Sequence, residues 1–193
     1  MIDRGRFIVS KALDEAGWLE ARMTGVTATA VAEAASGPAG FTNVMKAWGS
    51  NEGVTPNDFM RFGSDAESWI MAQLDVPAND WLICSEEDRR FMATPDGVTD
   101  DGTMIAEVKT TGTDWGSWAK VPIKYRRQVQ WQLFVVGPQA TSCLFAWMLR
   151  EEDPFGKFVP AWLSPRTVIV ERDEAMIDQL KAVAAKLLIE MNI

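Results

Sequence analysis

The chain has 193 residues, a net charge of −8, two Cys and no His. This length predicts a single domain, residues 1–193, that can bury a core of its own. The absence of His and the shortage of Cys exclude an ordinary zinc site and a four-cysteine iron–sulfur cluster. Without a long apolar run or a signal-peptide pattern, the sequence predicts a soluble cytoplasmic protein in which Cys84 and Cys143 are buried, reduced thiols.

The acidic balance argues against a broad basic coat for DNA, because phosphate contacts provide most sequence-independent affinity. Cations are nevertheless concentrated between Lys120 and Arg127, where four of them fall within eight residues. A local field can outweigh the net charge of a protein. The composition therefore allows DNA binding at a local basic surface only.

The N-terminal part of the chain contains two predicted helices. The first covers residues 27–35, because the segment begins with a capping Thr and ends before a Gly-Pro pair. The second begins at Thr55-Pro56-Asn57-Asp58, where a capping Thr, a Pro and an acidic first turn combine. Helical spacing of apolar residues carries it to about Leu74, with Glu67 beside apolar neighbours.

The middle of the chain predicts strands over residues 81–84, 90–98 and 104–111. The last two are expected to form a hairpin, because Asp101-Gly102 between them favours a two-residue type I′ turn. The later elements are predicted as a loop at 112–120, a helix at 122–136, a buried strand at 141–149, a hairpin of 158–163 with 167–171, and a C-terminal helix at 173–191. This mixture indicates an α/β domain.

The predicted hairpin brings charged side chains together. With Asp101-Gly102 as the turn, Asp96 lies directly opposite Glu107, and Lys109 points from the same face as Glu107. Two carboxylates across a strand pair repel each other, so a divalent cation between them is the economical explanation. Asp96, Glu107 and the Val108 carbonyl are therefore predicted to hold Mg²⁺ or Mn²⁺, which prefer oxygen ligands.

Five segments of the sequence occur in the order of a known family. They are Trp18 to Thr29, Phe62 to Glu67, Pro95 to Gly97, Ile105 to Lys109, and Tyr125 to Gln132. The chain resembles the lambda-exonuclease-like, YqaJ-type viral recombinase family of the PD-(D/E)xK nuclease superfamily. Thr29 stands where the family pattern has Ser.

The resemblance implies a restriction-endonuclease-like α/β fold, with a central mixed sheet flanked by helices and the site at the hairpin edge. It also implies a Mg²⁺-dependent exonuclease that resects double-stranded DNA from a 5′ end and leaves a 3′ overhang for a single-strand annealing partner. Family members form a toroidal trimer, so a homo-oligomer is implied, in the host cytoplasm if the chain is phage-encoded.

The resemblance also assigns roles to single residues. Glu67 becomes a ligand to a metal-bound water or to a second ion, and Gln128 supports the site. Lys109 is expected to orient or deprotonate the attacking water. Arg22 and Thr29 resemble the family's pocket for a DNA 5′-phosphate, since a guanidinium and a hydroxyl both donate to phosphate.

A wider set of residues is predicted to contact DNA. Tyr125, Gln128 and Gln132 share one helix face at i, i+3 and i+7, among cations and beside the hairpin. Tryptophans in the Gly- and Ser-containing loop that follows the hairpin are able to stack on bases. The candidate contacts are Tyr125, Gln132, Lys120, Lys124, Arg126, Arg127, Trp115 and Trp118.

Other interpretations stay open. Asp96 and Glu107 are also typical of solvated residues that flank a turn, and Lys109 could serve only as an ion-pair partner of Glu107. A PD-(D/E)xK endonuclease of restriction or repair type would use nearly the same residues. A catalytically silent DNA-binding module with a nuclease fold is the third alternative, although such a module has no need for an unfavourable carboxylate pair.

Overall fold

The computed structural model describes residues 2–50 and 57–193. No helix in these ranges is long and apolar enough to cross a membrane. The helices are η1 (Arg4–Arg6), α1 (Glu15–Arg22), α2 (Ala28–Ala34), α3 (Pro38–Gly49), α4 (Asp58–Met71), η2 (Trp118–Lys120), α5 (Ile123–Val136) and α6 (Glu174–Met191). The strands are β1 (Phe7–Ser10), β2 (Val26–Thr27), β3 (Trp81–Cys84), β4 (Phe91–Ala93), β5 (Gly97–Val98), β6 (Met104–Thr111), β7 (Ser142–Glu152), β8 (Phe158–Pro160) and β9 (Arg166–Glu171).

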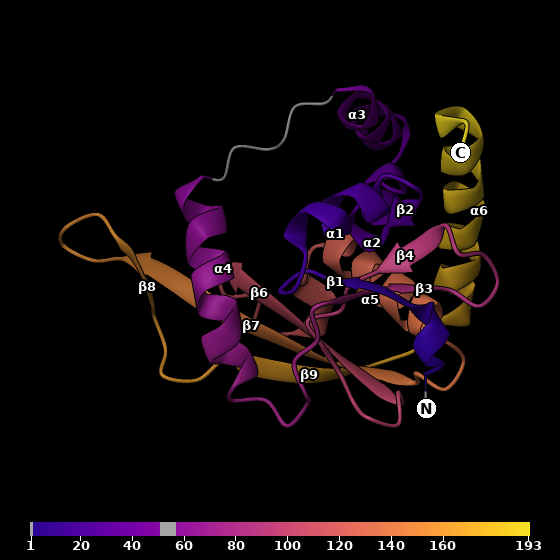
Figure 1. Cartoon of the computed structure of the whole chain (residues 1–193). Coiled ribbons are helices and arrows are strands. Elements are labelled where there is room, and N and C mark those ends of the chain that lie inside the picture. Colours follow the sequence, from indigo (N-terminus) through magenta and orange to yellow (C-terminus); the bar gives the residue numbers. More distant parts are fainter. Residues whose placement is uncertain (1, 51–56) are drawn as a thin grey trace.

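The strands form two mixed sheets (Figure 1). The first sheet has the order β1-β3-β4-β2, and β2 is the strand that runs parallel to its neighbour. In the second sheet, β5 pairs antiparallel with β6, β6 runs parallel to β7, and β7 pairs antiparallel with both β9 and β8. The predicted α/β architecture with mixed sheets flanked by helices is thus confirmed.

Helices cover both faces of the second sheet (Figure 1). On one face, Ala66 and Ile70 of α4 pack in a cluster with Ala106 and Val108 of β6. On the other face lies α5, whose second half is buried and also contacts β4 of the first sheet. Because side chains alternate along β6, Glu107 faces α5 while its two neighbours face α4.

The buried end of α5 is held by two arginines. The last carbonyls of a helix lack partners within the helix, and burial without partners is costly. Arg6 donates to the carbonyls of Val135 and Val136, and Arg172 Nη1 donates to the Leu133 carbonyl at 2.7 Å. These contacts fix the helix that carries Gln128 and Gln132.

The β5–β6 hairpin has the predicted register but a different turn. Gly97 pairs with Ala106, which is the register expected from placing Asp96 opposite Glu107. The turn is wider than predicted, because the Gly102 N–H donates to the Thr99 carbonyl at 2.8 Å and Asp101 does not take the positive φ that a type I′ turn requires. Gly102 has φ 74° and supplies the left-handed position alone.

Three other predictions need correction. The strand predicted over 90–98 is divided into β4 and β5, which lie in different sheets because the Thr94-Pro95-Asp96 segment crosses between them. The predicted closing hairpin does not form, since β8 and β9 each pair with a separate part of β7. The N-cap of α4 is Asn57, whose side chain accepts from the Met60 N–H at 2.9 Å. The predicted helix start at Thr55 and Pro56 lies outside the described residues.

No element was predicted at the positions of β1, α1 and α3, which the structure contains. Helices were predicted well at 27–35, 122–136 and 173–191, which correspond to α2, α5 and α6. Both cysteines are buried and free, as predicted.

Candidate functional site

Glu107 is the centre of a buried hydrogen-bond network. Its side chain is 1% exposed. Gln128 Nε2 donates to Oε1 at 2.6 Å, and Gln132 Nε2 donates to Oε2 at 2.7 Å. The Lys109 ammonium also donates to Oε1, and reaches the Val108 carbonyl at 3.1 Å. Since a carboxylate has about four acceptor positions, these three donors leave room for one further partner.

Asp96 has a different environment from Glu107. Its Oδ2 accepts the Val108 N–H at 2.7 Å, which joins the Pro-Asp-Gly segment to β6. Burial raises the pKa of the Asp96 carboxyl well above its ordinary value, and the negative charge of Glu107 raises it further. The Lys109 ammonium and the Val108 N–H lower this pKa, but they do not offset the effects of burial and Glu107.

Two lysines act on the third carboxylate, Glu67. Burial raises the pKa of Glu67, the charges of Lys109 and Lys11 oppose this rise, and Glu107 adds to it. The pKa of Lys109 is itself raised: burial works against its charge, but the neighbouring Glu107 and Asp96 outweigh burial. Lys109 is thus held as an ammonium beside the carboxylates.

The donors at this site fit a hard divalent cation in type. Asp96 and Glu107 supply carboxylate oxygens, and the Val108 carbonyl shares the Lys109 ammonium with Glu107. In the described part of the chain, no group of three or more His, Cys, Asp or Glu side chains lies close enough to hold a metal ion. The raised pKa of Asp96 nevertheless indicates a site that favours added positive charge.

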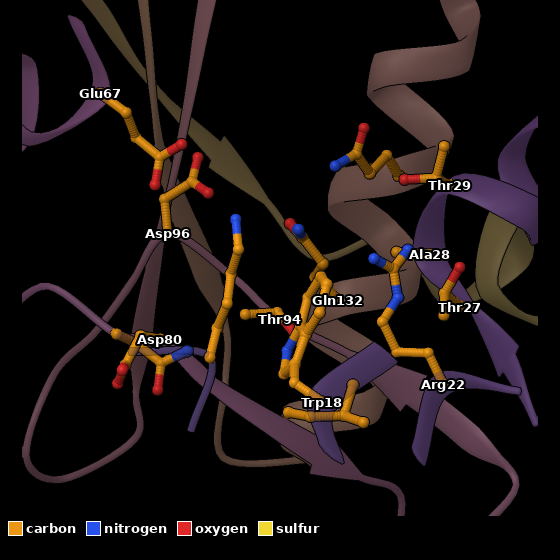
Figure 2. Close-up of a pocket in the computed structure, with 14 residues that line it drawn as sticks. Trp18, Arg22, Thr27, Ala28, Thr29, Glu67, Asp80, Thr94, Asp96 and Gln132 are labelled. Atoms are coloured by element: carbon orange, nitrogen blue, oxygen red, sulfur yellow. The ribbon is translucent and has the colours of Figure 1, made fainter. Parts of the chain in front are cut away.

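A cavity of about 220 Å³ leads away from the carboxylates. We call it the inner cavity, and its lining includes Lys11, Trp18, Arg22, Thr29, Thr94, Glu67, Asp96, Gln128 and Gln132. Figure 2 shows Glu67 and Asp96 facing each other at one end, with Arg22 and Thr29 at the other. The predicted phosphate pocket and two of the predicted metal ligands therefore share one cavity.

The inner cavity is lined by polar atoms that lack partners. Trp18 Nε1, Thr94 Oγ1 and Gln132 Oε1 are buried, and none of them has a hydrogen-bond partner among the described residues. Buried polar atoms are usually paired, so their grouping around one cavity points to a polar ligand or water there. The sequence analysis missed Thr94, although it directly precedes the Pro95-Asp96 pair.

Two cations of the inner cavity share one aromatic ring. The Arg22 guanidinium lies 4.2 Å from the centre of the Trp18 ring, and Lys11 Nζ lies 5.4 Å from it. Burial lowers the pKa of Arg22 from its ordinary value. Lys11 was missed as well, because a single lysine between β1 and α1 carries no motif.

A second, larger hollow of about 960 Å³ also borders Glu67. We call it the outer groove, and its lining includes Phe59, Glu67, Val108, Lys109, Trp115, Lys124, Tyr125, Gln128 and Arg150. Arg150, which the sequence analysis also missed, is stacked over Phe59 at 4.5 Å. Thr29, Glu67 and Gln128 line both hollows.

The predicted DNA contacts are divided between several surfaces. Trp115, Lys124 and Tyr125 line the outer groove, whereas Gln132 is 1% exposed and its amide is bonded to Glu107. Gln132 lines the inner cavity and not the outer groove. The others lie outside both hollows, and they are Lys120, Arg126, Arg127 and Trp118.

Local contacts explain why these residues are directed elsewhere. The Trp118 ring packs against Phe145 at 5.0 Å, and Arg126 lines a separate small cavity with Trp118. Arg127 Nη1 donates to Ser36 Oγ at 3.3 Å. The cluster of cations is thus spread around α5, because neighbouring helix positions point in different directions.

Comparison with known proteins adds independent information. A family model for the YqaJ-like viral recombinase domain matches residues 17–139. The alkaline exonuclease LHK-Exo from Laribacter hongkongensis is 24% identical, with a TM-score of 0.69 over 91% of this chain and 92% of that one. LHK-Exo in complex with dAMP gives a TM-score of 0.72 at the same identity and coverage.

A phage-related exonuclease from Haemophilus somnus 129PT is 16% identical, with a TM-score of 0.56 over 85% of this chain and 80% of that one. No curated protein matches the chain. The structural likeness shows that this chain shares the fold of the LHK-Exo structures.

Proposed function

The chain belongs to the YqaJ-like viral recombinase domain family, and from this premise we propose that it is a Mg²⁺- or Mn²⁺-dependent exonuclease that degrades double-stranded DNA from 5′ ends. The resulting 3′ overhang would serve a single-strand annealing partner in recombination. The related LHK-Exo was solved with dAMP, a deoxynucleoside monophosphate of the kind that an exonuclease releases. By family resemblance, the active form is a homo-oligomer, with a trimer as the expected state.

The inner cavity carries this proposal. Arg22, Thr29, Glu67 and Asp96 all line this one cavity. A terminal phosphate bound by Arg22 would place the first phosphodiester toward the carboxylates. The unpartnered Thr94 hydroxyl adds a third donor for that phosphate. A pocket for a chain end beside hydrolytic residues favours an exonuclease.

The proposed roles follow from the contacts of each residue. Asp96, Glu107 and the Val108 carbonyl would hold the divalent ion, with Glu67 as a further carboxylate near it. When bound there, the ion would supply positive charge for the reacting phosphate and lower the pKa of a coordinated water.

The remaining residues position the reactants. Lys109 is held as an ammonium, which orients the attacking water by donating a hydrogen bond. Gln128 and Gln132 fix both oxygens of Glu107, so that this carboxylate keeps its place when DNA enters. Preorganised groups of this kind avoid the cost of reorganisation during the reaction.

The outer groove would hold the part of the duplex that has not yet been cleaved. Lys124 and Arg150 line it, and its aromatic lining includes Tyr125 and Trp115. Cations track a DNA backbone and aromatic rings stack on bases. An endonuclease of the same superfamily is the second candidate. Only the inner cavity requires a DNA terminus, and the outer groove could also receive DNA that has no free end.

The test compares three DNA substrates at equal phosphate concentration. They are a linear duplex with 5′-phosphates, the same duplex with 5′-hydroxyls, and a relaxed, covalently closed circle. With Mg²⁺ we expect progressive loss of the linear duplex from its 5′ ends and survival of the circle. The 5′-phosphate should give an advantage of about ten- to a hundredfold, the value of a charge-assisted hydrogen bond.

Two controls define failure. EDTA should abolish hydrolysis, and Asp96→Asn should be inactive while it remains folded. Discrete internal cuts in the circle at the rate of the linear duplex would favour the endonuclease. DNA binding without any hydrolysis in Mg²⁺ or Mn²⁺ would favour the silent binding module.

A further inference from the structure

Two lysines lie near the carboxylates, each in a different hollow. Lys109 lines the outer groove and Lys11 lines the inner cavity. Glu67 lines both hollows, and the positive charge of each lysine lowers its pKa. The motifs of the sequence account for Lys109 and leave Lys11 without a role.

Within residues 2–50 and 57–193, the Lys11 ammonium contacts the Trp18 ring but makes no ion pair or hydrogen bond that would explain its position. The ion pairs of the described residues join it to no carboxylate. Its ammonium lies over the Trp18 ring, beside the stacked Arg22, and its side chain is exposed to the cavity. A lysine ammonium is a compact proton and hydrogen-bond donor that moves freely on its stem.

The chemistry of phosphodiester hydrolysis assigns different tasks to the two sides. The attacking and leaving oxygens lie roughly in line on opposite sides of the phosphorus. If Lys109 orients the attacking water from the outer groove, the leaving oxygen points into the inner cavity. That oxygen is the 3′ oxygen of the terminal nucleotide, whose 5′-phosphate is proposed to bind Arg22 in the same cavity.

We propose that Lys11 is a catalytic residue that donates a proton to the leaving 3′ oxygen of the terminal nucleotide. This inference rests on the proposed exonuclease function. In the step, the water oxygen forms a bond to phosphorus and the bond from phosphorus to the 3′ oxygen breaks. The 3′ oxygen takes a proton from Lys11 Nζ, the attacking water loses a proton to solvent, and Lys11 is reprotonated by solvent.

The experiment measures release of the first nucleotide under single-turnover conditions with Mn²⁺. One 5′-phosphorylated duplex has a natural first linkage, and the other has sulfur in place of its bridging 3′ oxygen. A thiol is far more acidic than an alcohol, so a thiolate leaves without a proton donor. The variants are Lys11→Met and Lys11→Arg, with Lys157→Met as a control at an exposed lysine outside both hollows.

Lys11→Met should slow cleavage of the natural linkage on the order of a hundredfold, as for loss of general acid catalysis. It should slow cleavage of the sulfur linkage by less than about threefold. Lys11→Arg keeps the charge but holds its proton, so it should bind DNA like wild type and cleave the natural linkage as slowly as Lys11→Met. Lys157→Met should match wild type on both duplexes.

Equal losses on both linkages in Lys11→Met would assign Lys11 to binding and overturn the proposal. Undiminished cleavage of the natural linkage would overturn it as well. Full activity of Lys11→Arg on the natural linkage would show that positive charge is enough for cleavage without proton donation, and it would also overturn the proposal. If wild type itself cleaves neither duplex, the proposed exonuclease function fails, and this outcome is visible without any variant.

Discussion

Asp96 and Glu107 are both carboxylates near β6, yet their surroundings differ. Glu107 receives donors from Lys109, Gln128 and Gln132, so its charge is compensated. Asp96 accepts one hydrogen bond from a backbone N–H. Burial and the charge of Glu107 raise the pKa of its carboxyl group. Removal of charge should therefore have opposite effects on stability at the two positions.

Without metal, Asp96→Asn should be at least as stable as wild type, because the amide oxygen can still accept the Val108 N–H. Glu107→Gln should lose about 3 kcal/mol, since the Lys109 ammonium is left without its buried partner and an amide group faces two glutamine donors. Denaturant unfolding of both variants in EDTA measures this difference. Equal destabilisation of the two variants would contradict the assigned surroundings.

The same pair predicts a pH dependence. The pKa of Asp96 is raised in the folded chain, so the folded state binds a proton more tightly than the unfolded state. Its penalty is complete above the raised pKa and disappears as pH falls toward the ordinary value. The stability advantage of Asp96→Asn in EDTA should thus shrink as the solution is acidified. Saturating metal at roughly a hundred times its Kd should restore about 2.7 kcal/mol to wild type and less to the variant.

At the level of elements, long periodic segments were predictable and short ones were not. β6, β7, α5 and α6 carry many alternating or helical positions, and their predictions were correct within a few residues. Strands such as β2 and β5 have two residues each, so no pattern repeats within them. β2 depends on pairing with β4, which is distant in the sequence, whereas β5 pairs within the predicted hairpin.

The site shows the same division. Glu67, Asp96 and Gln128 were predictable because motifs mark them, and the structure places all three along the inner cavity. Lys11 and Arg150 were not, because no motif contains either of them, and Arg150 reaches its hollow beside Phe59, which is distant in the sequence. The burial of Gln132 and its hydrogen bond to Glu107 cannot be read from helix spacing alone.

The β5–β6 hairpin requires a glycine at position 97, because its surroundings leave no room for a side chain. A Cβ at this position would lie 2.7 Å from Met71 Cε, 2.9 Å from the Pro77 carbonyl oxygen and 3.0 Å from Ala106 Cβ. Gly97→Ala should therefore destabilise the chain by about 1 to 3 kcal/mol and displace Asp96, with loss of activity. Gly49→Ala is the matched control, because a Cβ there meets nothing within 4 Å. Thermal unfolding of the two variants measures this difference: a steric clash should lower the melting temperature of Gly97→Ala but not that of Gly49→Ala.

At the level of the whole molecule, an acidic chain concentrates selected cations in two hollows. The net charge is −8, yet Lys11, Arg22, Lys109, Lys124 and Arg150 all line the inner cavity or the outer groove. DNA affinity should then come from few phosphate contacts, each of which contributes a salt dependence of its own.

Arg150→Ala should reduce the slope of log affinity against log salt by about 0.9, the value of one duplex phosphate contact. Its guanidinium is stacked on Phe59 and Phe158 and makes no ion pair among the described residues. The preference for 5′-phosphorylated ends should persist, because Arg22 is unchanged. Fluorescence anisotropy in EDTA over a salt series measures the slope, and an unchanged slope would remove Arg150 from the DNA path.

The crossing of Thr94-Pro95-Asp96 from one sheet to the other also has a mechanical consequence. Asp96 belongs to the connection between the sheets, whereas Glu107 lies inside the second sheet. A divalent ion held by both carboxylates would tie the two sheets together like a cross-link. Sliding of one sheet against the other would then require release of the ion, so its binding should slow amide exchange in strands that contain no ligand at all.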